Sequence, residues 1–446
     1  MKTYSRRIAI LWTAYSLKDN NGVYHFTRSF LKIAQQQNWK VDILFDRRSN
    51  IKGKNSYGEL TSLGARLLFP ENPIEDTIQK YYSFTSGVSA IELANLQMCL
   101  LESLQTNLYD LVICEPMFAS MIPQLSSINI PTMWYTHPPG SITGDYDDGH
   151  SNEKLFNYLD SISKNCTVGT QTEHNCTVLK NRGVNAKVLP LPFPDLEIFN
   201  AVTLPKNGIL FCGTTEDRKQ FKKYFDLIVE TKLPAKIMTS EKSGTKMSVM
   251  FADAGITDVD IRTHILGKDK RDFFASSKIF FTPSYSESFG YAFAEAISHT
   301  HAVAFDYEWT SNFDKSFCHI IPQKDYINYI AKLYNSNVPV PKGAMDYVQS
   351  MHKNAEQAWA DYINTSPENK KKFYKSFVEK NQNFWIKDLP KLIGRPALTL
   401  DEINPLLDRK TYGALNVTYT DTDTWASIDG TDPAAEVSDS FNNLFG

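Results

Sequence analysis

The stretch "KIFFTPSYSESFGYAFAEA" (residues 278–296) joins an apolar run to an amphipathic segment through a polar turn. The run at 278–284 predicts a buried β-strand, and the segment from Gly290 onward predicts a helix. The turn would therefore lie at the carboxyl edge of a sheet, where α/β proteins bind ligands. Two carboxylates flank this turn: Glu287 precedes it, and Glu295 follows about a turn and a half into the helix.

The backbone of this turn predicts an anion site. The N–H groups of Ser288, Phe289 and Gly290 would be unpaired first-turn donors, and the helix dipole adds about half a positive charge there. Phosphate groups bind at such positions, and a glycine lets the backbone approach them closely. A diphosphate between two groups rich in hydroxyls has the layout of a nucleotide sugar. A helix that is simply well capped by acidic residues would give the same pattern.

Length and composition favour a globular protein of more than one domain. The chain has 446 residues, of which 42% are hydrophobic, so two domains are expected. No apolar run approaches the ~20 residues of a membrane-spanning helix, and the N-terminal apolar stretch is better interpreted as a first strand than as a signal peptide. We therefore expect a cytoplasmic protein that does not bind a membrane. The six cysteines show no metal-binding spacing and are expected to be reduced core thiols.

Strand and helix patterns alternate along most of the chain. Residues 6–15, 22–37 and 40–46 predict a βαβ unit, with further strands near 110–115, 131–137 and 166–171. The helix at 22–37 is expected to bury one face, which carries Val23, Phe26, Phe30, Ile33 and Ala34. A proline-rich stretch at 187–200 predicts a linker. A second alternation then begins, with strands near 208–213, 235–240, 260–267, 278–284 and 301–306. Two doubly wound α/β domains account for this pattern.

The end of the chain differs in charge from the rest. Residues 343–395 predict helix, whereas 411–440 are expected to be mostly disordered. Six acidic residues and no basic residue follow Lys410, so the preceding 410 residues are net positive although the whole chain carries −3.

The stretch 283–296 resembles the E-x7-E signature of retaining GT-B glycosyltransferases. The resemblance implies a GT-B fold, with two Rossmann-like domains facing a central cleft. It implies that Glu287 contacts the hydroxyls of the donor sugar, that the amides at 288–290 hold the diphosphate, and that Glu295 holds the ribose. On this basis we expect an acceptor-side domain at 1–195 and a donor domain at 200–375. A helical segment at 376–395 would pack back toward the first domain, and 396–446 would form a flexible acidic tail.

The stretch "CGTTEDRKQFKKYFDLI" (212–228) resembles the family's loop and helix that present a basic pair to the diphosphate. Lys219 has the usual spacing after Gly213. Thr214 stands where the family has an arginine, and Arg218 can supply that charge if it points inward. Lys222 and Lys223 are interpreted as a solvated helix face.

The first domain contributes two further candidates. "DNNGVYHFTRSFL" (19–31) resembles the family's glycine loop, which implies that Gly22 lies close to the donor. His137, at the end of a predicted strand, matches a position where these enzymes often carry a histidine beside the sugar; a loop histidine with no such role fits the residues equally well. Asp145 and Asp147 form a D-x-D triplet, but a polar loop is a poor place for a metal site, so none is predicted.

The resemblance implies transfer with retention, by attack from the same face as the leaving group, with a UDP-sugar as co-substrate and no metal or other cofactor. Glycoside hydrolysis also uses paired carboxylates, but the anion site between Glu287 and Glu295 argues against it.

The acceptor is indicated less directly. Residues 213–227 also resemble the α-glucosyltransferases of T-even-type bacteriophages, which modify 5-hydroxymethylcytosine in DNA. The net positive body and the basic, aromatic stretch "ENKKKFYKSF" (368–377) agree with a DNA partner. The terminal "FNNLFG", with Phe441, Leu444 and Phe445, suits docking in a hydrophobic groove, such as that of a sliding clamp.

Several alternatives to this acceptor and activity stay open. The sugar is glucose or a pentose such as arabinose. The acceptor could instead be a cell-envelope glycan or a small molecule. The chain could also be a non-catalytic sugar-nucleotide-binding module or a nucleotide-sugar epimerase.

Overall fold

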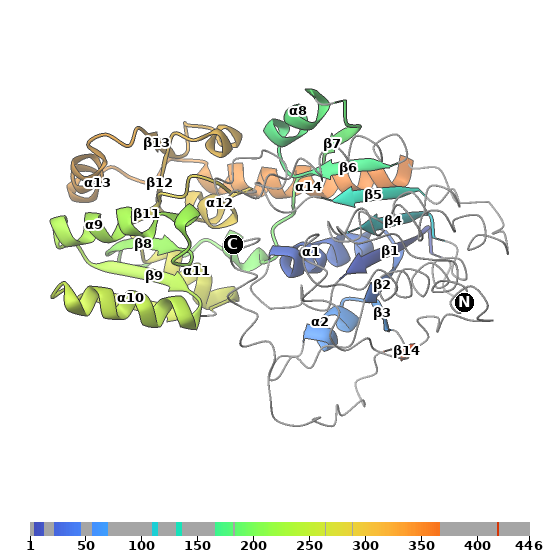
Figure 1. The fold of residues 1–446 in the computed structure, drawn as a ribbon, viewed down its shortest axis with the longest axis horizontal. Helices are drawn as coiled ribbons and strands as arrows, with labels where there is room; N and C mark the ends of the chain where they lie inside the picture. The colour runs from blue at the N-terminus through green and yellow to red at the C-terminus, as the bar shows by residue number, and fades with distance from the viewer. Residues whose placement is uncertain are drawn as a thin grey trace, which may run out of the picture.

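The computed structural model describes residues 4–12, 22–45, 56–69, 109–114, 131–135, 166–181, 183–263, 265–287, 289–365 and 417–418. These residues form two α/β units, each built on its own sheet (Figure 1). The α/β class predicted from the alternating pattern is confirmed.

The first sheet has strand order β14-β3-β2-β1-β4-β5-β6-β7, and its described pairs are parallel except β14 with β3. The strands are β1 (Arg6–Trp12), β2 (Trp39–Phe45), β3 (Arg66–Phe69), β4 (Leu111–Cys114), β5 (Thr132–Tyr135), β6 (Thr167–Thr170), β7 (Ala186–Val188) and β14 (Val417–Thr418). The helices described in this unit are α1 (Gly22–Gln36), α2 (Ser56–Ser62) and α8 (Glu173–Asn181).

The second sheet has strand order β10-β9-β8-β11-β12-β13 and is parallel throughout. The strands are β8 (Ile209–Cys212), β9 (Ala235–Thr239), β10 (Val259–Thr263), β11 (Ile279–Thr282), β12 (His301–Phe305) and β13 (His319–Ile321). The α-helices are α9 (Phe221–Thr231), α10 (Glu241–Asp253), α11 (Gly267–Ala275), α12 (Tyr291–Ile297), α13 (Tyr326–Asn335) and α14 (Ala344–Thr365). Three short 3₁₀ helices are η3 (Leu196–Phe199), η4 (Asp217–Lys219) and η5 (Glu308–Asn312).

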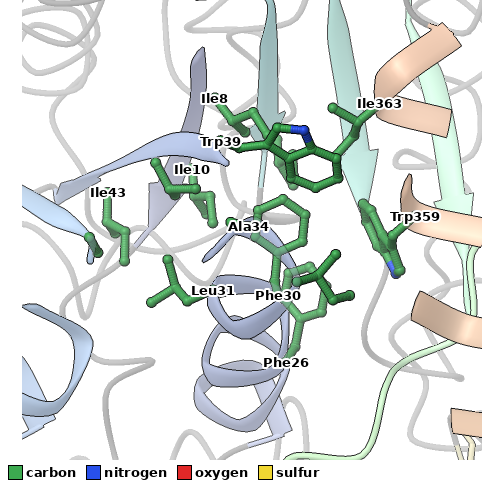
Figure 2. Close-up of a cluster of buried hydrophobic side chains, with 14 of the residues drawn as sticks. Ile8, Ile10, Phe26, Phe30, Leu31, Ala34, Trp39, Ile43, Trp359 and Ile363 are labelled. Atoms are coloured by element: carbon green, nitrogen blue, oxygen red, sulfur yellow. The ribbon is translucent and has the colours of Figure 1, made fainter. Parts of the chain in front are cut away.

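The core of the first unit forms between its sheet and α1. The apolar positions of α1 repeat every three or four residues and so fall on one helical face. Phe26, Phe30, Ile33 and Ala34 on this face are all buried, and Figure 2 shows Phe26, Phe30 and Ala34 among side chains of the sheet strands. The sequence pattern at 22–37 therefore predicted both the helix and its buried side.

Helix α14 belongs to both hydrophobic cores. Its first turns contribute Ala344 and Val348 to the core of the second unit, and its last turns contribute Trp359 and Ile363 to the core of the first. The Trp359 ring is fully buried, with ring centroids 5.4 Å from Phe26 and 5.3 Å from Phe30. The helical pattern predicted from residue 343 is confirmed as far as Thr365, and residues 366–395 lie outside the described part of the chain.

The proline-rich segment at 187–200 connects the two cores. After β7, Leu191 packs in the first core and Phe193 in the second, which is consistent with a linker. Two side chains of α14 hold this segment: Trp359 Nε1 donates to the Pro190 carbonyl at 3.0 Å, and His352 Nδ1 accepts from the Phe193 amide at 2.9 Å. The tail was expected to be mostly disordered, but its residues 417–418 form β14 beside β3.

Candidate functional site

The polar turn between β11 and α12 lies at the carboxyl end of a central strand of the second sheet. Its last residue, Gly290, has φ +85°, and a Cβ there would lie 2.8 Å from Trp309 Cζ3. Glycine is therefore required both for the left-handed backbone and for the close approach of the indole. The sequence placed the amides at 288–290 in the first turn of the helix. That placement was wrong, because α12 begins at Tyr291 and Gly290 is its N-cap.

The turn still presents free backbone donors just before the helix. Among the described residues, the amides of Phe289 and Gly290 donate no hydrogen bond. The Phe289 side chain is buried against Phe193 and Phe313, which anchors the turn. Ser288 lies outside the described residues. The amides of Phe289 and Gly290, two of the three predicted donors, therefore have no acceptor among the described residues.

Three of the predicted charged residues come together beside this turn. Lys219 Nζ lies 2.6 Å from Glu287 Oε1, and Arg218 Nη1 lies 3.4 Å from Glu287 Oε2. The segment that carries both basic residues is held to the turn by its backbone, because the Tyr285 amide donates to the Arg218 carbonyl at 3.0 Å. Arg218 also pairs with Glu216 at 3.2 Å. The guanidinium of Arg218 therefore points toward the site.

The three charged side chains of this cluster are largely buried, so the charge of each one affects the others strongly. The side chains of Glu287, Lys219 and Arg218 are 14%, 15% and 18% exposed. Burial acts to raise the pKa of the Glu287 carboxyl, but the charges of Lys219 and Arg218 outweigh it and hold the pKa below its usual range. The carboxylate of Glu287 is therefore ionised at neutral pH.

Gly213 and Thr214, from the stretch that resembles the family's basic loop, precede Lys219 in the same loop. A Cβ at Gly213 would lie 3.3 Å from Lys219 Cδ, so the missing side chain leaves room for the lysine stem. Thr214, where the family has arginine, has a buried hydroxyl with no hydrogen-bond partner among the described residues. Arg218, from the same loop, brings a second guanidinium or ammonium charge to the cluster besides that of Lys219.

The second carboxylate, Glu295, lies on α12 and is only 1% exposed. Its Oε1 lies 2.6 Å from Nζ of Lys270 on α11. Burial acts to lower the pKa of Lys270, but attraction to Glu295 outweighs it, and the pKa is raised above its ordinary value. Burial raises the pKa of the Glu295 carboxyl above its usual range, although the charge of Lys270 opposes this effect. The lysine stays protonated, so Glu295 has a charged partner of its own and does not share Lys219.

The remaining candidates are placed only in part. Gly22 is the first residue of α1. His137, Asp145 and Asp147 lie outside the described residues. The described cysteines are all free, and most are buried, in line with core thiols. No cluster of metal-ligating side chains occurs in the part of the chain that the structure describes.

Sequence reasoning missed Lys270 and Trp309. Lys270 lies in "GKDKRD" (267–272), which has the composition of an exposed helix start. Trp309 fixes the turn through its Nε1, which donates to the Ser284 carbonyl at 3.0 Å. Neither residue carries a spacing signal, because both reach the site through the tertiary fold.

The chain was compared with known proteins by sequence and by structure. It matches no protein-family model and no curated protein sequence. HepE of Anabaena, in complex with UDP and glucose, superposes with a TM-score of 0.58 at 12% identity, covering 81% of this chain and 100% of that one. A TarM variant of S. aureus, in complex with fondaparinux, alpha-GlcNAc-glycerol and UDP, gives 0.58 at 13% identity, covering 81% and 100%.

A third similar structure is the α,α-trehalose 6-phosphate synthase of Burkholderia multivorans, with a TM-score of 0.57 at 9% identity, covering 81% of this chain and 96% of that one. These neighbours are GT-B glycosyltransferases, and the present chain has the same fold of two parallel-sheet units. The GT-B fold implied by the turn motif is confirmed. None of the helices in the described ranges is long and apolar enough to span a membrane.

Proposed function

We propose that this chain is a retaining glycosyltransferase that moves glucose, or a pentose such as arabinose, from a UDP-sugar to 5-hydroxymethylcytosine in phage DNA. The observation that carries the donor half of the proposal is the cluster of Lys219, Arg218 and Glu287 beside the free amides of Phe289 and Gly290. This arrangement supports binding of a diphosphate, and two of the similar structures contain UDP.

The two basic residues and the turn amides would stabilise the leaving diphosphate. Charge develops on the phosphate oxygen as the bond to the sugar breaks, and fixed donors directed at such an oxygen contribute roughly 3–4 kcal/mol each by analogy with oxyanion sites. Lys219 would turn from Glu287 toward the phosphate, or bridge the two. Arg218 supplies the charge of the family's arginine, whose position is occupied by Thr214 in this chain.

The two glutamates would hold the ends of the donor. Glu287 is ionised and lies beside the diphosphate site, so it can accept hydrogen bonds from the sugar hydroxyls. Glu295 is eight residues further on and would accept from the ribose. In this scheme Glu287 positions the sugar and does not attack it. The leaving phosphate oxygen takes the proton of the acceptor hydroxyl, which attacks from the same face.

The DNA acceptor rests on the sequence. The resemblance to phage α-glucosyltransferases, the positive charge of residues 1–410 and the basic stretch at 368–377 all favour it. A clamp-binding role for the terminal peptide would bring the enzyme to newly made DNA. Residues 366–395 and the terminal peptide lie outside the described part of the chain.

One observation favours a second acceptor class. TarM was captured with alpha-GlcNAc-glycerol, and its fold matches this chain as well as that of HepE does. A cell-envelope glycan or a small polyol is therefore the second candidate acceptor.

Release of UDP tests the proposal. The protein is incubated with UDP-glucose or UDP-arabinose and with duplex DNA that contains either cytosine or 5-hydroxymethylcytosine. We expect UDP release that depends on the hydroxymethyl group and is lost in Lys219→Met. Lys222→Met is the matched control, because Lys222 is 80% exposed and pairs with Asp226 on the same helix. Release with a polyol but with neither DNA would replace the DNA acceptor by the second candidate.

A further inference from the structure

The ion pair of Lys270 and Glu295 is buried, unlike most ion pairs of a protein surface. Lys270 is 13% exposed and Glu295 1% exposed, and their charged atoms are 2.6 Å apart. Removing both charges from water is costly, and such a pair is often no more stabilising than apolar residues of the same size. The pair joins α11 to α12, and its charges act on Cys212 together with those of Lys219 and Glu287, which places the pair near the proposed donor site. Its presence there invites a functional explanation.

The carboxylate of Glu295 is only half satisfied. Oε1 accepts from Lys270, whereas Oε2 is buried and has no hydrogen-bond partner among the described residues. A buried carboxylate oxygen that accepts no hydrogen bond is unfavourable. A hydroxyl group of a bound ligand would supply the missing donor without moving Glu295.

The surroundings of Lys270 place it next to the other α/β unit. Asp195 of the linker accepts at 2.6 Å from the amide of Gly267, which starts α11, and its charge also acts on Lys270. His25 of α1 lies close enough for the charge of Lys270 to add to the effect of burial, and together they lower the pKa of His25 to about 3. His25 is therefore neutral, and Lys270 is the charged donor that faces Glu295.

We propose that Lys270 is a positioning residue that fixes Glu295 so that Oε2 accepts a ribose hydroxyl, and that it thereby makes the site selective for ribonucleotides over deoxyribonucleotides. This inference rests on the proposed donor site and extends it. Lys270 occupies Oε1, so the carboxylate cannot rotate away, and a nucleotide that lacks the hydroxyl leaves Oε2 buried and unpaired. Sites that are built to bind a hydroxyl reject the analogue without it for this reason.

The test compares the binding of UDP, 2′-deoxy-UDP and 3′-deoxy-UDP by calorimetry. We expect the wild-type protein to bind UDP at least about tenfold more tightly than one of the two deoxy analogues. In Lys270→Met the affinity for UDP should fall by about the same factor, while the affinity for that analogue changes little, so the ratio approaches one. Lys270→Arg, which keeps the charge, should restore the ratio. Lys222→Met should leave it unchanged.

A purely structural ion pair gives a different result. In that case Lys270→Met lowers the melting temperature but leaves the ratio of UDP to deoxy-UDP affinity at its wild-type value, which overturns the inference. If Lys270→Met does not fold, the double variant Lys270→Met/Glu295→Gln avoids an unpaired buried charge. We expect it to have lost the selectivity, and a wild-type ratio in this variant equally overturns the inference.

The outcome for the wild-type protein separates the two proposals. Failure of the wild-type protein to bind UDP overturns the donor site and this inference with it. Binding of UDP with equal selectivity in the wild-type and Lys270 variants overturns the role of Lys270 alone.

Discussion

Replacing Gly290 by alanine tests the geometry of the turn that precedes α12. The residue has φ +85°, a conformation that costs an alanine about 1–2 kcal/mol. The new Cβ would also lie 2.8 Å from Trp309 Cζ3. The indole is 5% exposed and is held by its hydrogen bond to Ser284, so it cannot move freely, and overpacking of this kind costs about 1–3 kcal/mol. We expect a total loss of roughly 2–5 kcal/mol.

Gly255→Ala is the matched control. Gly255 also has a positive φ, +68°, but a Cβ there has no atom within 4 Å among the described residues. It should lose only the conformational part, about 1–2 kcal/mol. Urea unfolding, followed by tryptophan fluorescence, gives the two midpoints. A loss in Gly290→Ala no larger than that in Gly255→Ala would refute the close approach of Trp309 to the turn.

Two further predictions concern the stability of the fold. Trp359→Ala should destabilise the protein by about 3–5 kcal/mol in urea, because the fully buried indole joins α14 to the first core, and a loss under 1 kcal/mol would contradict that packing. Burial lowers the pKa of His299 to about 4, so the folded state favours the neutral ring. The contribution of the neutral His299 ring to the free energy of unfolding is complete above pH 6.5. It falls by up to about 3 kcal/mol as the pH drops toward 4. The stability difference between wild type and His299→Gln should shrink over this interval, and a constant difference would contradict the assignment.

The elements that could be predicted from the sequence are those whose pattern is local. The strand, turn and helix at 278–296 and the amphipathic face of α1 were found because apolar spacing alone defines them. Strands β3, β7 and β13 were missed, since each has only three or four residues and shows no period of its own. The start of α12 was placed one residue too early, because Gly290 adopts a left-handed conformation that apolar spacing does not reveal.

In the candidate site, too, some residues could be recognised from the sequence, whereas others depend on tertiary contacts. The resemblance to GT-B glycosyltransferases implied that Glu287, Lys219 and Arg218 share one site, and the structure brings the three side chains together. The direction of Arg218 depends on a backbone contact across 67 residues of chain, between its carbonyl and the Tyr285 amide. Lys270 could not be recognised, because only the packing of α11 against the rest of the unit buries a lysine that otherwise resembles any exposed helix residue.

A crystal structure with UDP tests the central claim most directly. We predict that the diphosphate lies within hydrogen-bond distance of Lys219 Nζ and of the amides of Phe289 and Gly290. A UDP molecule bound away from the β11–α12 turn, with Lys219 still paired only with Glu287, would contradict the account.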